Sequence, residues 1–383
     1  MAYRVILKKN EEKRVLAGHS WVYANEVARI EGKDKNGSLA EVVAHDGRYI
    51  GKGYINHLSK ILVRIFIRGQ EEDGEELYRE RIAAAQALRE KLFDSAQNNC
   101  YRLVFAEADD LPALIIDCYA GYFVLECLSL GVDMRKKMIA DALVSLYSPK
   151  GIYMRGDVAV RKKEGLPLEN ELLYGEIPDK ILIKENGLLM SVDVKNGQKT
   201  GYFLDQKENR FAVRRYCRGA SVLDCFCNSG GFSLNAATVA REVTALDISP
   251  FALENVEENA RLNGFTNIKT ECADVFDALT SNRPYRRPWS VAETEEYMLG
   301  GCGVHFDFDV TAAFLRSFNP YPVGTMVSLS DGRHGVVVKN NTNVLRPVVR
   351  IYGEGAGEEI DLGNDFRFLS LMITGIYSGN YNI

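Results

Sequence analysis

At 383 residues the chain is long enough for two or three domains, and its 46% hydrophobic and 26% charged residues are typical of a soluble globular protein. No run of about 18 apolar residues occurs, and the first residues become charged too early for a secretory signal, so we expect neither a membrane span nor export. The eight cysteines are scattered without a CxxC pair, which indicates a reduced cytoplasm and predicts neither a metal site nor a disulfide framework.

The first 69 residues combine a strand-like pattern with positive charge. Short segments of alternating apolar residues between glycine-rich turns predict a small antiparallel barrel or sandwich. These residues hold thirteen Lys/Arg against seven Asp/Glu, a net charge of +6, so the remainder carries −11 of the total of −5. A basic module on an acidic body is typical of a polyanion-binding appendage, although a merely solvated charged face would give the same count.

Residues 70–185 predict a central domain of mixed helices and strands. A helix is expected within 71–95, and a second near 133–147. LPALIIDCY and YFVLECLSL read as paired strands joined at Ala120-Gly121, and KILIKENGLLMSVDV as a hairpin turning at Asn186-Gly187. The apolar stripe of the first helix consists of Leu77, Ile82, Ala85, Leu88 and Leu92.

From residue 196 the pattern alternates between strand and helix. SVLDCF, EVTALDI and NIKTECAD read as buried strands, with helices GGFSLNAATVA and SPFALENVEENARLNG between them. The second helix has Ser249 as N-cap, Pro250 in its first position and Gly264 as its stop. Such βα units predict a parallel sheet with right-handed crossovers, in the strand order 3-2-1.

The segment VLDCFCNSGGFSLNAA (222–237) places a glycine-bearing turn between a strand and a helix. Glycines there let a ligand approach the backbone. Asp247 ends the next strand, 17 residues after Gly230, where an acid can bind ribose hydroxyls, and Asp274 ends the third. The combination favours a nucleoside-bearing cofactor over an α/β domain with no ligand.

Four segments together resemble the cofactor half of class I S-adenosylmethionine methyltransferases, and most closely the bacterial 23S rRNA cytosine-C5 methyltransferases of the RlmI type. They are NGQKTGYFLDQKENR (196–210), VLDCFCNSGGFSL, ALDISPFALENVEENARLNG and ADVF. The resemblance implies S-adenosylmethionine as cofactor, with Asp247 on the ribose and Asp274 beside the adenine. The implied cofactor-binding residues are Lys199, Thr200, Gly201, Phe203, Asp205, Asp224, Phe226, Asn228, Gly230, Asp247, Ile248, Asp274 and Val275. Asp205 and Glu208 also fit a capping box for the following helix, and both interpretations of Asp205 stay open.

The resemblance extends back to the start of the chain and covers residues 1–279. GHSWVYANEV (18–27) and GRYIGKGYIN (47–56) resemble the PUA barrel that opens this family, and YRLVFAEADDLPALIIDCY (101–119) resembles its central domain, with Ala113 where glycine is usual. PUA modules bind structured RNA, which implies 23S rRNA as partner and agrees with the positive charge of this region. Trp21 fits a core position better than a base-stacking one. The RNA-binding candidates are Arg14, His19, Lys52 and Arg64, each of which could equally be an ordinary surface residue.

The motifs that would activate a pyrimidine are absent from the sequence. Enzymes of this family add a cysteine thiolate to C6 of cytosine and use an acid to stabilise the ring. They take these residues from a DPP loop and a TCS-like loop, and this chain contains neither. NPYP (319–322) has the wrong order for an NPPY loop and reads as a turn. Cys225, Cys227 and Cys272 belong to the cofactor side, so no catalytic residue is assigned.

Downstream of residue 279 a second resemblance takes over. DVFDALTSNRPYRRPWS, GGCGVHFDFDVTAAFL and PYPVGTMVSLSDGRHGVVV resemble the last third of an HD-GYP cyclic-di-GMP phosphodiesterase, but the HD pair and the GYP triplet are missing. His305 and His334 read as surface residues and not as metal ligands. The chain therefore reads as a fusion at ADVFDAL. Part of the tail, 323–352, is rich in β-strand signals.

The predicted architecture is multidomain α/β. It consists of a PUA-like barrel (1–69), an α+β central domain (70–185), an incomplete Rossmann-like methyltransferase domain (186–279) and an α+β tail (280–383). Loss of the later strands leaves SVLDCF as an exposed edge, through which a homo-oligomer could form. The expected function is an S-adenosylmethionine-dependent 23S rRNA methyltransferase without turnover. The alternatives are a non-catalytic RNA-binding protein with a remnant methyltransferase scaffold and, remotely, a cyclic-di-GMP phosphodiesterase fragment.

Overall fold

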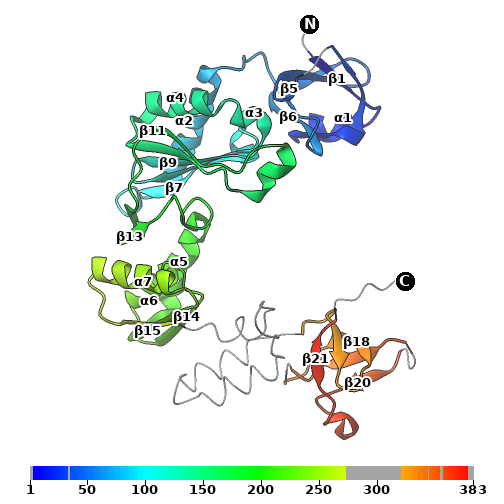
Figure 1. Cartoon of the computed structure of the whole chain (residues 1–383), viewed down its shortest axis with the longest axis vertical. Helices are drawn as coiled ribbons and strands as arrows, with labels where there is room; N and C mark the ends of the chain where they lie inside the picture. The colour runs from blue at the N-terminus through cyan, green and yellow to red at the C-terminus, as the bar shows by residue number, and fades with distance from the viewer. Residues whose placement is uncertain (1–2, 33–34, 273–320, 344, 354–356, 378–383) are drawn as a thin grey trace. The chain divides into compact units, whose positions relative to one another are not determined.

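The computed structural model describes residues 3–32, 35–272, 321–343, 345–353 and 357–377. The chain divides into two units, residues 1–216 with 258–266, and residues 217–257 with 267–383, and each is described by itself. The elements confirm a multidomain α/β protein (Figure 1). Within the described residues no helix is both long and apolar enough to cross a bilayer.

The N-terminal module is a six-stranded sheet in the order β2-β6-β5-β4-β1-β3. Its neighbouring strands run antiparallel except β1 and β4, which are parallel. Alternating side chains bury Val5, Val42 and Val63 in one apolar core. The elements are β1 (Tyr3–Leu7), α1 (Glu12–Leu16), β2 (Trp21–Tyr23), η1 (Ala24–Glu26), β3 (Val27–Glu31), β4 (Leu39–Val43), β5 (Tyr49–Ile55) and β6 (Ile61–Ile67).

The central domain is a five-stranded sheet, β11-β10-β9-β8-β7, with α2 and α4 packed on one face (Figure 1). The predicted pairing through Ala120-Gly121 is confirmed, because β8 and β9 are antiparallel neighbours. The predicted stripe is only partly correct, since Leu88 and Leu92 of α2 are exposed. The elements are α2 (Glu75–Leu92), β7 (Cys100–Phe105), η2 (Ala106–Asp109), β8 (Leu114–Tyr119), β9 (Tyr122–Cys127), α3 (Leu130–Asp133), α4 (Lys136–Tyr147), β10 (Gly151–Met154), η3 (Ala159–Glu164) and β11 (Glu171–Gly175).

The barrel and the central domain share one core and one buried polar cluster. Tyr54 and Phe66 of the barrel pack in the apolar cluster of the central domain. Glu164 of η3 is buried and accepts hydrogen bonds from Asn56 Nδ2, Ser59 Oγ and Arg64 Nη2 at 3.0, 2.5 and 2.8 Å. This carboxylate therefore fixes the barrel against the central domain.

Replacing Glu164 with glutamine should destabilise that junction. The substitution leaves the buried Arg64 guanidinium without its negative partner, and a hydrogen bond to a charged group contributes about 1.5 to 3 kcal/mol. We expect a decrease of that size in the free energy of unfolding, measured by urea denaturation. Asp46→Asn, which breaks a fully exposed ion pair with Arg48, is the control and should change the free energy of unfolding little, because water screens such pairs. Equal losses in the two variants would contradict the structural role of Glu164.

A hairpin and a helix complete the first unit. β12 (Ile181–Glu185) and β13 (Leu188–Val192) pair antiparallel, and Asn186 and Gly187 have φ of 52° and 80°, as the predicted Asn-Gly turn requires. They are followed by η4 (Leu204–Gln206) and α5 (Lys207–Cys217).

The second unit contains a parallel three-stranded sheet in the order β14-β15-β16, which confirms the predicted order. Its elements are β14 (Ser221–Cys225), α6 (Gly231–Ala237), β15 (Glu242–Asp247), the part of α7 (Pro250–Leu262) before residue 258, and β16 (Ile268–Cys272). The predicted start of α7 is also found: Ser249 Oγ accepts from the amide of Ala252 at 3.3 Å. Among the described residues β14 pairs with β15 alone, so β14 is an edge strand there.

The C-terminal part forms a separate antiparallel sheet, β20-β19-β18-β17-β21, around a core that includes Val327, Val337 and Ile360. The β-rich character predicted for 323–352 is confirmed. The strands are β17 (Met326–Leu329), β18 (His334–Lys339), β19 (Val348–Ile351), β20 (Glu359–Asp361) and β21 (Ile373–Ile376), with η5 (Phe366–Phe368) between the last two.

Candidate cofactor site

The turn after β14 has a left-handed backbone at three positions. Phe226, Asn228 and Gly230 have φ of 63°, 50° and 81°, a left-handed conformation that glycine adopts most easily. A Cβ on Gly230 would lie 3.0 Å from side-chain atoms of Leu234 and Val256, so any larger residue would force these neighbours apart. The tight turn therefore depends on Gly230.

Asp247, at the end of β15, holds this turn in place. One carboxylate oxygen accepts from the amide of Asn228 at 2.9 Å, and the other accepts from the amide of Ser249 at 3.0 Å. A carboxylate has about four acceptor positions, and the two amides fill two of them. The remaining acceptor capacity suits the two hydroxyls of a ribose.

Asp224 lies deeper, near the end of β14. Burial raises the pKa of its carboxyl, while a hydrogen bond from Ser233 Oγ at 2.6 Å lowers it in part. This contact ties β14 to α6. Asp224 therefore has a structural role, since it accepts the hydrogen bond that connects β14 to α6.

The group of residues fits a nucleoside-bearing cofactor. A tight left-handed turn at residues 226–230 lies beside the Asp247 carboxylate, which has acceptor capacity to spare. Phe226 and Ile248 add exposed apolar surface, which suits a flat base. The structure thus brings together Asp224, Phe226, Asn228, Gly230, Asp247 and Ile248, whereas Asp274 and Val275 lie outside the described residues.

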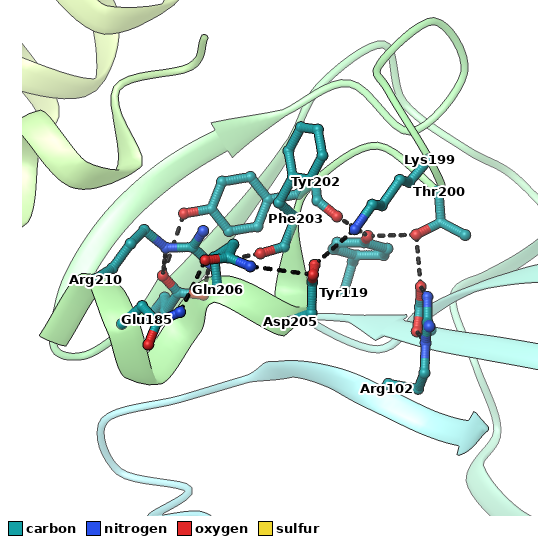
Figure 2. A network of polar contacts seen from close by, with 12 residues as sticks. Arg102, Tyr119, Glu185, Lys199, Thr200, Tyr202, Phe203, Asp205, Gln206 and Arg210 are labelled. Atoms are coloured by element: carbon teal, nitrogen blue, oxygen red, sulfur yellow. Dashed lines mark hydrogen bonds and ion pairs between the residues drawn. The ribbon is translucent and has the colours of Figure 1, made fainter. Parts of the chain in front are cut away.

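Five of the predicted cofactor-binding residues, Lys199, Thr200, Gly201, Phe203 and Asp205, lie in one loop of the first unit, residues 199–205, which we call the 199–205 loop (Figure 2). Lys199 Nζ contacts Asp205 Oδ1 at 2.8 Å and lies 4.7 Å from the centre of the Phe203 ring. Gly201 has φ of 125°, and a Cβ there would lie 2.7 Å from the Cα of Val194. The backbone geometry therefore requires a glycine at position 201.

Two predictions about this loop need correction. Thr200 has an exposure of 0%, so its side chain offers a cofactor no surface, and its hydroxyl donates to Asp117 at 2.6 Å. Asp205 was predicted either to cap a helix or to contact the cofactor. Its carboxylate contacts Lys199 and Gln206 instead of capping the helix with Glu208.

The sequence pattern did not predict which residues hold the 199–205 loop in place. Arg210 of α5 makes two hydrogen bonds to Glu185, at 2.6 and 2.7 Å, and one to the Phe203 carbonyl at 2.9 Å (Figure 2). Asp117, which accepts from Thr200, pairs with Arg102 at 2.8 Å. The predicted strands contained a signal for this ion pair, because Arg102 and Asp117 carry opposite charges and are direct cross-strand partners in β7 and β8.

The four RNA-binding candidates do not form one surface cluster. Arg14 and His19 meet at 2.8 Å, and Arg14 also forms an ion pair with Glu26 at 2.6 Å. Lys52 of β5 lies opposite Glu41 of β4. Arg64 is buried against Glu164, which does not support a role in phosphate binding. Trp21 is half-buried, and its indole nitrogen donates to Glu107 at 2.7 Å.

The described cysteines are mostly interior residues. Burial raises the pKa of the thiols of Cys100, Cys118, Cys127, Cys217 and Cys227. A nucleophilic cysteine needs a lowered pKa, so these five are poor nucleophiles. In the described residues no group of three His, Cys, Asp or Glu side chains is placed to hold a metal ion.

Two family models match parts of the chain. Residues 5–68 match the model of the PUA-like domain, and residues 158–279 match the model of S-adenosylmethionine-dependent methyltransferases, which confirms the predicted cofactor. A putative S-adenosylmethionine-dependent methyltransferase from Streptococcus mutans shares the fold, with a TM-score of 0.61, 21% identity, and coverage of 73% of this chain and 72% of its own. A second solved structure, a putative methyltransferase complexed with SAH, has a TM-score of 0.62 at 21% identity, covering 73% of this chain and 72% of its own.

Curated relatives extend the match over most of the chain. The ribosomal RNA large subunit methyltransferase I of Shewanella amazonensis is 38% identical over 343 residues, which cover 86% of each protein. The protein of the same name from Klebsiella pneumoniae is 34% identical over 379 residues, 96% of this chain and 91% of its own. The chain therefore belongs to the ribosomal RNA large subunit methyltransferase I family.

Proposed function

We propose that this chain binds S-adenosylmethionine and 23S rRNA at a site of the cytosine-C5 type, and that it does not complete methyl transfer. The observation that carries the cofactor half is the Asp247 carboxylate, which fixes the glycine turn and keeps acceptor capacity for a ribose. The family resemblance adds the 199–205 loop, with Lys199, Gly201, Phe203 and Asp205, as the binder of the methionine end. Asp274 and Val275 complete the proposed set.

When bound, the cofactor supplies a methyl group on a positively charged sulfur. The chain's own residues would orient it: Asp247 by accepting ribose hydroxyls, and the 226–230 turn by offering close backbone approach. The Asp205 carboxylate, paired with Lys199, is exposed enough to contact the methionine end. These groups bind and position the donor.

The proposal of no turnover rests on the missing pyrimidine-activating groups. C5 of cytosine becomes nucleophilic only after a thiolate adds to C6, and the DPP and TCS-like motifs that carry the acid and the thiol in this family are absent. The buried thiols described above do not replace them. The fusion at ADVFDAL (273–279), which lies outside the described residues, remains a prediction, as does pairing of a second copy along β14.

Titration calorimetry with S-adenosylhomocysteine separates this proposal from a non-catalytic RNA-binding scaffold. We expect saturable heat at one site, whereas a remnant scaffold would give none. RNA binding is tested separately by its salt dependence. If about three phosphates are contacted, affinity should fall on the order of 40-fold between about 50 and about 200 mM salt, because counterions are released. RNA affinity that ignores salt would contradict the role of the basic barrel.

A further inference from the structure

The inner side of the 199–205 loop is fixed by the central domain. Asp117 of β8 has an exposure of 0%, and both its oxygens accept from Arg102 of β7, at 2.8 and 2.9 Å. One of these oxygens also accepts from the Thr200 hydroxyl at 2.6 Å (Figure 2). A buried, charge-assisted hydrogen bond thus connects the central sheet to the loop.

The direction of each hydrogen bond in this group follows from the number of protons. The Thr200 hydroxyl has one proton, and the ionised Asp117 can only accept, so Thr200 donates to Asp117. The Tyr119 hydroxyl then donates to Thr200 at 2.8 Å, since its other acceptor, the Tyr202 carbonyl, is 3.5 Å away. Both contacts of the Thr200 oxygen are therefore specified, which holds the side chain in one orientation.

Two further anchors lie on either side of Thr200. Arg155 of the central domain is buried and donates to the carbonyls of Val194 and Gly197, at 3.1 and 2.9 Å. Arg210 donates to the carbonyl of Phe203 at 2.9 Å. The backbone from 194 to 203 is thus held at three points, of which the central one depends on Asp117.

We propose that Asp117, supported by Arg102, is a positioning residue for cofactor binding, acting through Thr200 on the 199–205 loop. The inference rests on the proposed function, in which the exposed Lys199 and Asp205 and the half-buried Phe203 face the cofactor. Thr200 cannot touch the cofactor, yet it fixes the backbone between residues that can. The central domain then determines the conformation of the 199–205 loop through Asp117.

The test compares four variants of the full chain. Thr200→Val removes the hydroxyl at nearly constant volume, Thr200→Ser restores it, and Asp117→Asn removes the charge. Asp109→Asn is the matched control, because it breaks another buried ion pair of the central domain, with Arg89 at 2.5 Å, without contacting the loop. Thermal unfolding confirms that each variant is folded, and Thr200→Val keeps the test available if Asp117→Asn fails to fold.

The first readout needs no cofactor. Hydrogen exchange of the amides of residues 195–206 should become faster in Thr200→Val and Asp117→Asn and stay at the level of the wild type in Thr200→Ser and Asp109→Asn. Unchanged exchange in Thr200→Val would overturn the proposed anchoring. This result is independent of whether the chain binds a cofactor.

The second readout is the dissociation constant of S-adenosylhomocysteine. We expect it to rise about tenfold or more in Thr200→Val and Asp117→Asn, the loss that a buried hydrogen bond to a charged group carries, and to change little in the other two variants. Faster exchange with unchanged affinity would overturn the positioning role. Absence of binding by the wild type would instead refute the proposed function, while the exchange measurement would still decide the anchoring.

Discussion

Replacing Glu185 with alanine is expected to lower the free energy of unfolding by about 3 to 5 kcal/mol, because it leaves a buried arginine without its negative partner. The side chains of Arg210 and Glu185 are only 3% and 0% exposed, and Tyr202 also donates to Glu185, at 3.2 Å. Urea-induced unfolding followed by circular dichroism measures the change. Without this carboxylate, Arg210 is no longer held in place. Its hydrogen bond to the Phe203 carbonyl should weaken, which disturbs the 199–205 loop.

The control for Glu185 is Glu359→Ala. Glu359 pairs with Arg350 at 2.6 Å, but the two side chains are 48% and 52% exposed, so their removal should cost less than about 1 kcal/mol. If the two alanine variants lose similar stability, the importance we assign to the buried pair is wrong.

Replacing Asp247 with alanine should strongly weaken the binding of S-adenosylhomocysteine. Two hydrogen bonds between a carboxylate and ribose hydroxyls contribute about 1.5 to 3 kcal/mol each, so the affinity for S-adenosylhomocysteine should fall about a hundredfold or more. The loss of the contacts to the amides of Asn228 and Ser249 loosens the turn and adds to the effect. Titration calorimetry measures it.

The matched control is Glu242→Ala, at the opposite end of the same strand. Glu242 contacts Ser221 and Arg241 at the exposed start of β15. Its replacement removes an acid from β15 without touching the turn, and affinity should stay within about twofold, the context scatter of single surface substitutions. An Asp247 variant that still binds as tightly as this control would refute the ribose assignment.

Local signals in the sequence were strong enough to predict several elements closely. The Ser-Pro start of α7 satisfies a free amide and fixes the first φ angle, so the helix begins where predicted. Ala113, where the resemblance implies a glycine, has φ of 64°, a conformation that glycine adopts without strain.

Contacts between distant segments could not be predicted from periodicity. Leu88 and Leu92 continue the apolar stripe of α2, but they are exposed. Their neighbour Arg89 contacts the sheet instead, by donating to the Arg102 carbonyl of β7 at 3.0 Å. The partner of Thr200 lies 83 positions earlier, so no local pattern connects them. Positive charge indicated the barrel's role but could not distinguish Arg64, whose partner Glu164 comes from another domain.

The most direct test of the account is transfer of a radiolabelled methyl group from S-adenosylmethionine to 23S rRNA by the purified full chain. It is performed at a cofactor concentration that calorimetry has shown to saturate the protein. We predict saturable cofactor binding with no label in the RNA above the level without protein. Label recovered as 5-methylcytosine would contradict the proposal that the groups needed to activate the base are missing.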